Sequence, residues 1–217
     1  MAYSTSALIA EVLDKSKDPA FPRDRILTYL QRVQDQVLGH HMLKFNEKRV
    51  AASLNVADTT YAPAETYQQA IQAVLSHATL AQPSELIYLS NQEFFERFPD
   101  PAIYSQGMPL YFTDYGGDLY FDRPLDKAYT LGLRYTEASS RLTDATNSTP
   151  QIPQEFDGIY IHAGLAGIEA YRENFDLEAI HLRRVEDITA DLLGRYSLRV
   201  KRPGKARTIR RRGDDGW

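Results

Sequence analysis

The chain has 217 residues, no cysteine and a formal net charge of −4 at pH 7. Without cysteine, disulfide bonds, cysteine-ligated zinc, iron–sulfur clusters and thiol nucleophiles are excluded. Hydrophobic residues make up 43% and charged residues 25% of the chain, which are values of a globular protein and exclude wholesale disorder. The N-terminal residues lack a basic region and a long apolar run. We therefore expect neither a signal peptide nor a segment of the roughly 18–20 apolar residues that crosses a bilayer.

Charge is distributed unevenly along the chain. From Arg195 onward there are nine basic and two acidic residues, which leaves 16 basic and 27 acidic residues in the rest. The C-terminal segment is thus +7 and the remainder −11. Opposite signs of this kind favour docking of the segment on the same or a neighbouring protein, or on a polyanion.

Two amphipathic helices are expected at the start of the chain. The first covers residues 5–16, and Ser4 is its N-cap because its hydroxyl can accept a hydrogen bond from the first turn. The second covers residues 22–41 and has apolar residues at i, i+4, i+7 and i+11, the spacing of a helix with one buried face. It ends at His40–His41, where imidazole is favourable beside a helix C-terminus. Adjacent helical residues point in different directions, so we expect no metal site there.

The next stretch is less regular. Residues 47–80 contain short apolar runs that periodicity assigns to neither helix nor strand. Residues 85–89 predict a short strand, and a short helix follows with Ser90 or Asn91 as its cap.

A β-hairpin is predicted over Tyr111–Phe121, where apolar residues alternate on both sides of the turn sequence DYGGD. A third strand at Ala128–Thr136 alternates over eight residues, and we expect it beside the hairpin in an antiparallel sheet. Aspartates flank these turns, where their side chains form local hydrogen bonds; they are Asp114, Asp118, Asp122 and Asp126. The many tyrosines suit a surface in contact with a partner, and β propensity explains them equally well.

Two further helices are expected after a polar surface loop at residues 139–154. The first covers residues 154–174, and its small residues HAGLAGIEA allow another helix to approach closely. His162 lies in this stretch and is expected at a helix–helix contact. Asp176 is expected to cap the last helix, which ends near Gly194.

The order of these elements predicts a mainly α fold. A helical bundle of two N-terminal and two C-terminal helices (residues 1–46 and 151–195) carries a small antiparallel β-rich insertion with a short helix (residues 47–150). An extended basic C-terminal tail follows (residues 196–217).

The chain shows no catalytic motif. G-x-S-x-G, H-E-x-x-H and G-x-G-x-x-G are absent from the sequence. The glycine pair in DYGGD lacks the lysine and hydroxyl residue of a phosphate-binding loop and precedes no predicted helix. We therefore expect no enzymatic activity, no cofactor and no metal.

Two long segments resemble the head-to-tail adaptor (connector, or head-completion) proteins of tailed bacteriophages. They are MPLYFTDYGGDLYFDRPLDKAYTLGLRYTEASSRL and IPQEFDGIYIHAGLAGIEA, in which a strand pair, a proline turn, a strand ending in tyrosine and a polar loop lead to a helix. The early segment RDRILTYLQRVQDQVL also resembles the second helix of that family. In this form the resemblance covers most of residues 1–195.

The resemblance implies a structural protein of the virion neck, made in the host cytoplasm. Such adaptors form a ring, commonly a dodecamer, between the portal of a DNA-filled capsid and the tail. The implied partners are the portal protein, neighbouring copies and a downstream tail or nozzle protein. DNA would pass through the lumen without specific binding, and no membrane is involved.

The resemblance also gives the C-terminal segment a role, because in this family it often lies along the portal. Arginine suits such docking, since its planar fork engages carboxylates and carbonyls bidentately, and a terminal tryptophan adds an aromatic anchor. The portal contacts implied are Arg199, Lys201, Arg202, Lys205, Arg207, Arg210, Arg211, Arg212 and Trp217. Contacts with a neighbouring copy or the tail are expected at Tyr111, Tyr115, Tyr120 and Arg134.

Two alternatives stay open for the basic segment. It is a solubilising tail, or it is the arm of a non-enzymatic DNA-binding module that neutralises phosphates. A DNA-binding arm would shift duplex DNA with a steep salt dependence, whereas a portal-docking segment would not.

Overall fold

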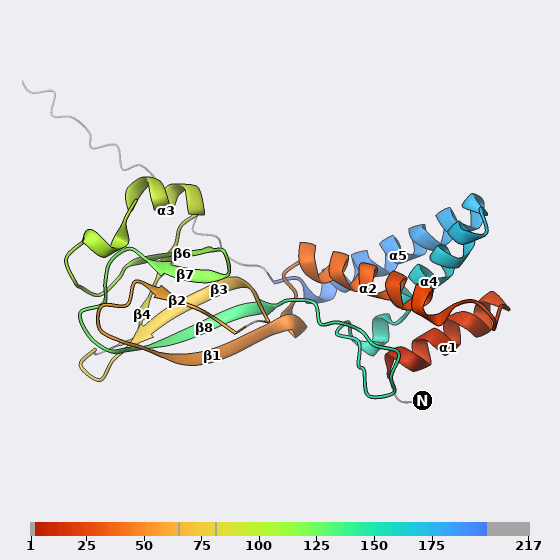
Figure 1. Cartoon of the computed structure of the whole chain (residues 1–217), viewed down its shortest axis with the longest axis horizontal. Coiled ribbons are helices and arrows are strands. Elements are labelled where there is room, and N and C mark those ends of the chain that lie inside the picture. Colours follow the sequence, from red (N-terminus) through yellow and green to blue (C-terminus); the bar gives the residue numbers. More distant parts are fainter. Residues whose placement is uncertain (1–2, 65, 81, 199–217) are drawn as a thin grey trace, which may run out of the picture.

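The computed structural model describes residues 3–64, 66–80 and 82–198. In this part of the chain, four helices lie at one end of an elongated molecule and the strands lie at the other (Figure 1). The four helices at the first end are α1 (Thr5–Ser16), α2 (Arg23–His40), α4 (Gly158–Tyr171) and α5 (Phe175–Tyr196), and α3 (Asn91–Arg97) packs on the strands. Short 3₁₀ helices stand at Lys44–Asn46, Pro101–Ile103 and Gln154–Phe156. Among the described residues, no helix has the length and apolar character needed to span a bilayer.

The N-terminal helices form as the sequence predicts. Ser4 caps α1 by accepting a hydrogen bond from the Ala7 N–H at 3.3 Å. α1 ends at Ser16, and its C-cap Lys17 has a φ of 54° that turns the chain out of the helix. α2 ends at His40, as expected. Its predicted apolar stripe is buried and comprises Ile26, Leu30, Val33 and Val37.

α4 is the central helix of this end, because α1, α2 and α5 all pack against it. The small residues of α4 make this possible, as the sequence predicts. A Cβ added at Gly164 would lie 2.9 Å from Val12 of α1, and one added at Gly167 would lie 2.2 Å from the Tyr29 ring of α2. The helices therefore approach α4 so closely that alanine does not fit without a shift.

The last helix begins differently from the prediction. Asn174, rather than Asp176, stands at the N-cap of α5, and Asp176 lies in the first turn. A carboxylate is favourable there too, because the amide end of the helix dipole attracts negative charge.

The strands form two four-stranded sheets. The first sheet has the order β1-β8-β3-β4 and is antiparallel throughout; its strands are β1 (Glu47–Leu54), β8 (Tyr129–Glu137), β3 (Tyr67–Ser76) and β4 (Ser84–Glu85). The second has the order β2-β7-β6-β5; its strands are β2 (Thr60–Tyr61), β7 (Asp118–Phe121), β6 (Tyr111–Tyr115) and β5 (Ile87–Tyr88). One hydrophobic core joins the inner faces of the two sheets; it includes Leu54, Leu75, Phe112, Phe121 and Leu131.

The predicted fold class is therefore wrong. The β part is not a small insertion in a mainly α bundle: it has two four-stranded sheets and a hydrophobic core separate from that of the helices. The amino-acid pattern does not predict β1, because most of its side chains are exposed or half-buried and the strand has no apolar alternation. The pattern does not predict β3 either, because its register shifts between Ala70 and Gln72. The shift places Ala70 and Ala73 in the core although they are three residues apart, which breaks the alternation of a regular strand.

The hairpin is predicted correctly and its neighbour is not. β6 and β7 pair through a turn whose Gly116 and Gly117 have φ of 65° and 95°, the positive values that a type I′ turn requires at both central residues. The strand at 128–136 forms as β8 with the predicted alternation, but it lies in the other sheet between β1 and β3. The hairpin instead pairs with the short strands β2 and β5.

The loop from β8 to α4 is fastened to the helices. The Gln34 amide of α2 donates to the Ser140 carbonyl at 2.9 Å and to Gln151 Oε1 at 3.3 Å, and the buried Tyr160 hydroxyl donates to Gln34 Oε1. Leu142 of the loop is buried in the helical core. This segment is therefore more closely packed than the surface loop predicted from its polar sequence.

The predicted C-terminal tail lies almost wholly outside the described residues. Of residues 196–217, only Tyr196, Ser197 and Leu198 are described. Ser197 forms an antiparallel bridge with Leu43, and the Leu198 N–H donates to the Met42 carbonyl at 2.8 Å. The described part of the chain thus ends beside Met42 and Leu43, where the helices meet the sheets.

Candidate assembly surfaces

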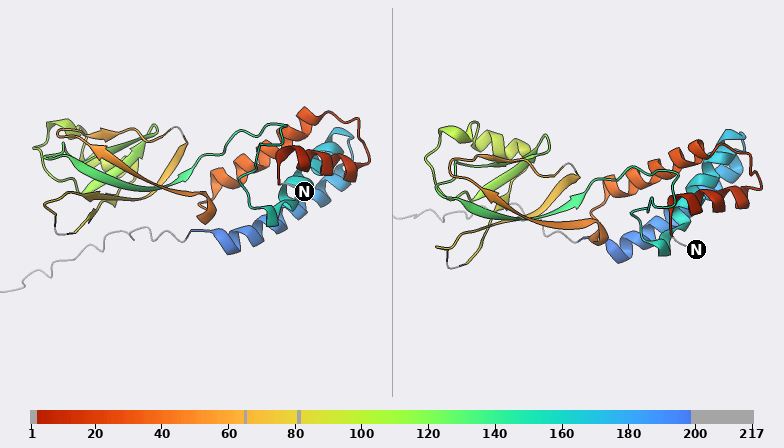
Figure 2. Two further views of the ribbon diagram at one scale, coloured as in Figure 1. Left: turned by 90° about the horizontal axis from the view of Figure 1, so that it is seen from below. Right: turned by 60° about the horizontal axis from the view of Figure 1, so that its bottom comes forward.

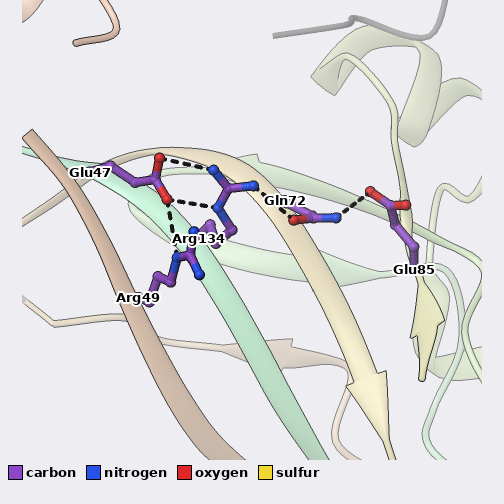
Figure 3. Close-up of polar contacts among 5 residues, drawn as sticks. All are labelled: Glu47, Arg49, Gln72, Glu85 and Arg134. Carbon is purple, nitrogen blue, oxygen red and sulfur yellow. Dashed lines mark hydrogen bonds and ion pairs between the residues drawn. The ribbon is translucent and has the colours of Figure 1, made fainter. Parts of the chain in front are cut away.

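Arg134 lies on the outer face of the first sheet, at the centre of a polar network (Figure 3). Its guanidinium donates to both Glu47 oxygens of β1, at 2.8 and 2.9 Å, and to Gln72 Oε1 of β3 at 3.2 Å. Gln72 in turn donates to Glu85 of β4 at 2.8 Å, and Arg49 donates to Glu47 at 3.2 Å. The network therefore crosses all four strands of the sheet.

The same network sets the charge state of the pair. The hydrogen bond from Arg134 lowers the pKa of Glu47, and the hydrogen bond from Glu47 raises the pKa of the Arg134 guanidinium. The Arg134 side chain is 33% exposed and that of Glu47 only 12%. Arg134 is thus committed to a contact within its own chain, while part of its guanidinium still reaches the surface of the sheet.

The three predicted tyrosines lie on the opposite outer face of the sandwich, beneath α3. The ring centroid of Phe95 lies 5.6 Å from that of Tyr115 and 5.7 Å from that of Tyr120. The ring centroid of Tyr111 lies 5.8 Å from that of Phe98. Tyr115 is 56% exposed. The structure thus brings the tyrosines together and separates them from Arg134, so the four residues do not form one site.

The sequence reasoning missed the α3 side of this surface. We name it the aromatic face; its ring contacts form two groups, Phe95 with Tyr115 and Tyr120, and Phe98 with Tyr104 and Tyr111. The buried Phe94 ring contacts both Phe95 and Phe98 and so connects the two groups. Nearby Ile103 is 74% exposed. The run EFFERF was the available signal, because it places aromatic residues on two sides of a short helix: one side is buried and the other reaches the tyrosines.

Two of the turn-flanking aspartates, Asp114 and Asp122, form hydrogen bonds beyond their turns, and Asp114 joins the two sheets. Asp114 accepts hydrogen bonds from the Tyr67 hydroxyl of the other sheet at 3.0 Å and from Tyr88 at 2.9 Å. Burial raises the pKa of Tyr67, and the Asp114 carboxylate raises it further. Asp122 is buried and accepts from the N–H groups of Leu110 and Tyr111, at 2.9 and 3.1 Å. These carboxylates have structural partners beyond the local turn contacts predicted for them.

The helical histidines do not form a metal centre in the described part of the chain. His162 of α4 and His181 of α5 stack with ring centroids 5.3 Å apart and Nδ1 atoms 3.1 Å apart, so His162 lies at a helix–helix contact as predicted. The amino-acid pattern alone does not indicate that the two histidines meet. Across residues 3–64, 66–80 and 82–198, no group of three or more histidine and acidic residues could hold a metal ion. The absence of a bound metal stays a prediction.

The predicted portal contacts, Arg199 to Trp217, lie outside the described residues.

Comparison with known proteins gives one family. The family model described as SU10 adaptor protein matches residues 3–211, nearly the whole chain. No curated protein matches the chain. The match confirms the resemblance inferred from the strand and helix segments: the chain belongs to the SU10 adaptor protein family, a family of phage head–tail adaptors, and is a structural component of the virion.

Proposed function

We propose that this adaptor forms a ring between the portal of a DNA-filled capsid and the tail, and that Arg199–Trp217 docks on the portal. The observation that supports this most is the extent of the family match. It runs to residue 211 and so includes every basic residue of this segment except Arg212.

The two ends of the molecule divide the work in this proposal. The helices of residues 1–46 and 151–195 pack in the ring, and the β part of residues 47–150 faces the next tail or nozzle component. The segregation of helices and sheets to opposite ends supports this division (Figure 2). Exposed apolar side chains at the aromatic face support it too, since Ile103 is 74% and Tyr115 56% exposed, and patches of this kind mark partner surfaces.

The chemistry of the C-terminal segment suits a protein partner. Between Arg199 and Trp217 there are eight basic and two acidic residues. Six of the basic residues are arginines, whose fork engages carboxylates and backbone carbonyls bidentately. Each segment would bind weakly alone, and a ring would strengthen it, because one docked copy holds its neighbours at high effective concentration. DNA would cross the lumen without specific binding, since the rest of the chain is net acidic.

A truncation tests the proposal. A chain lacking Thr208–Trp217 is expected to stay folded, because residues 3–198 already contain both hydrophobic cores. It is expected to lose attachment to capsids that carry a portal but no adaptor. Electron microscopy and co-sedimentation of the capsids measure the attachment. Bound rings of truncated chains, at wild-type occupancy, would contradict portal docking through this segment.

Two arginine variants separate geometry from charge. Replacing Arg207, Arg210, Arg211 and Arg212 by lysine keeps the charge and removes the planar forks, whereas replacing them by glutamine removes both. Bidentate docking predicts that both variants lose attachment. A DNA-binding arm predicts that only the glutamine variant fails, and that the wild type shifts duplex DNA with a steep salt slope.

A further inference from the structure

A groove runs along the helical end of the molecule, between α2 and α5. Its first part is lined by side chains of α2, α4 and α5, and its second part continues between α2 and α5 to His40 and His41. The two parts share Val33, Gln36 and Val185, so they form one channel, which we name the α2–α5 groove.

The floor of the groove is lined by apolar residues. Its α4 residues are small and include Ala163 and Ala170, and Val33 and Val185 stand beside them; the Tyr29 ring of α2 already covers Gly167. Ala163 of the floor is only half-buried and Leu182 of the α5 wall is 46% exposed, so the groove leaves apolar surface for an occupant. The groove is therefore a seat for an amphipathic helix.

The rims of the groove carry charged side chains. Glu178 and Glu186 stand on the α5 rim and Arg32 on the α2 rim. None of the three takes part in a salt bridge in the part of the chain that the structure describes. An occupant with cations beside an apolar ridge would complement the acidic rim.

The other side of α5 presents such a ridge. Leu182 faces the groove, and Ile180, two residues earlier, points about 200° away from it on the helix. Ile180 is 55% and Leu177 is 42% exposed. Arg183 and Arg184 flank this ridge, and neither forms a salt bridge within the described residues. We name Leu177, Ile180, Arg183 and Arg184 the α5 ridge.

We propose that the α2–α5 groove of one copy seats the α5 ridge of the next copy, with Arg183 and Arg184 against the acidic rim. This inference rests on the proposed ring and names its subunit interface. The groove and the ridge lie on different sides of the same helix, so the contact is heterologous, and heterologous contacts close into rings when the rotation allows. Arg183 and Arg184 would meet Glu178 and Glu186 in this pairing, which favours this occupant over an uncharged helix.

The cysteine-free chain makes the interface directly testable. Gln36→Cys places a thiol on the groove and Ile180→Cys places one on the ridge, and both side chains are exposed. After treatment with a short bismaleimide, a mixture of the two single variants is expected to give a covalent dimer, and the double variant a ladder of multimers. The matched control combines Ile180→Cys with Ala10→Cys, which is exposed on α1, and is expected to give monomer.

A charge variant measures the same contact during assembly on adaptor-free capsids. Ile180→Asp is expected to lower ring occupancy about tenfold or more, whereas Val56→Asp, which changes a comparably exposed apolar residue of the β part (51% against 55%), leaves it unchanged. Normal ring formation by Ile180→Asp would contradict the proposed interface without contradicting the ring itself. Crosslinking of the control pair as strong as that of Gln36→Cys with Ile180→Cys would contradict it too. Crosslinks from the groove into residues 199–217, identified by mass spectrometry, would overturn it in favour of the C-terminal segment. If the wild type forms rings neither in solution nor on capsids, the proposed function itself fails.

Discussion

Replacing Gly167 with alanine tests the close packing of α4 against α2. A Cβ at this position would lie 2.2 Å from Tyr29 Cδ2 and 2.4 Å from Tyr29 Cγ, well below the 3.0 Å that real Cβ contacts respect. Because Cγ is fixed by the first side-chain torsion, a flip of the ring about its own axis does not relieve the contact. The helix or the whole tyrosine must move, and overpacking of this kind costs about 1–3 kcal/mol.

The intrinsic preference of alanine for helices acts in the opposite direction and is removed by a matched control. Gly194 lies within α5, and a Cβ added there would meet no atom within 4 Å. Both substitutions gain at most about 1 kcal/mol of helix propensity. We therefore expect Gly194→Ala to raise the free energy of unfolding slightly, and Gly167→Ala to fall about 1–3 kcal/mol below it.

Urea unfolding followed by circular dichroism in the helical band measures both variants. In a chain of this size each kcal/mol corresponds to a shift in Tm of about 2–4 °C, so thermal melts give a second reading. Equal stability of the two variants would mean that Tyr29 moves freely, and the reasoning from close helix packing would be refuted.

Three further variants test the polar contacts. Arg134→Gln removes the ion pair across the first sheet and is expected to lower the free energy of unfolding by about 1 kcal/mol, since the pair is partly exposed. Arg49→Gln removes one exposed contact and should lower the free energy of unfolding by less than about 0.5 kcal/mol. Urea titration measures both variants. Gln34→Leu leaves buried partners of α4 and the loop unpaired, so we expect a loss of about 1–3 kcal/mol and faster hydrogen exchange in that loop. Burial, followed by the nearby charge of His181, lowers the pKa of His162. Below about pH 6.5 the unfolded chain therefore binds more protons than the folded chain, so the free energy of unfolding falls as the solution is acidified. His162→Gln should make the free energy of unfolding less dependent on pH in this range.

Local chemistry explains which elements were predicted correctly. The α2 stripe, the Ser4 cap and the Gly116–Gly117 turn each depend on residues a few positions apart, and all three form as expected. The small residues of α4 led to a correct prediction as well, because they permit close approach of a neighbouring helix, whichever helix it is.

Long-range pairing explains what was not predicted. β8 pairs with β1 through partners such as Glu47 and Thr136, which are far apart in the chain, and nothing in the β8 pattern distinguishes this sheet from that of the hairpin. The same holds for the candidate surfaces. Tyr115 and Tyr120 were recognised from alternation, but Phe95, which joins them, was not, because the packing of α3 on the second sheet is a tertiary contact.

The junction between the helices and the sheets explains how the adaptor can act as one body. The Asn46 side chain donates to the Glu137 carbonyl, which fastens the start of β1 to the end of β8. The Gln151 side chain accepts from the Ser140 N–H at 2.6 Å and donates to the Ala138 carbonyl at 3.3 Å, which stiffens the strand exit. The Leu43–Ser197 bridge adds the end of α5 to the same place. Each of these segments at the junction is thus held by at least one hydrogen bond, so the orientation of the sheets relative to the helices depends on side-chain contacts as well as on the covalent chain.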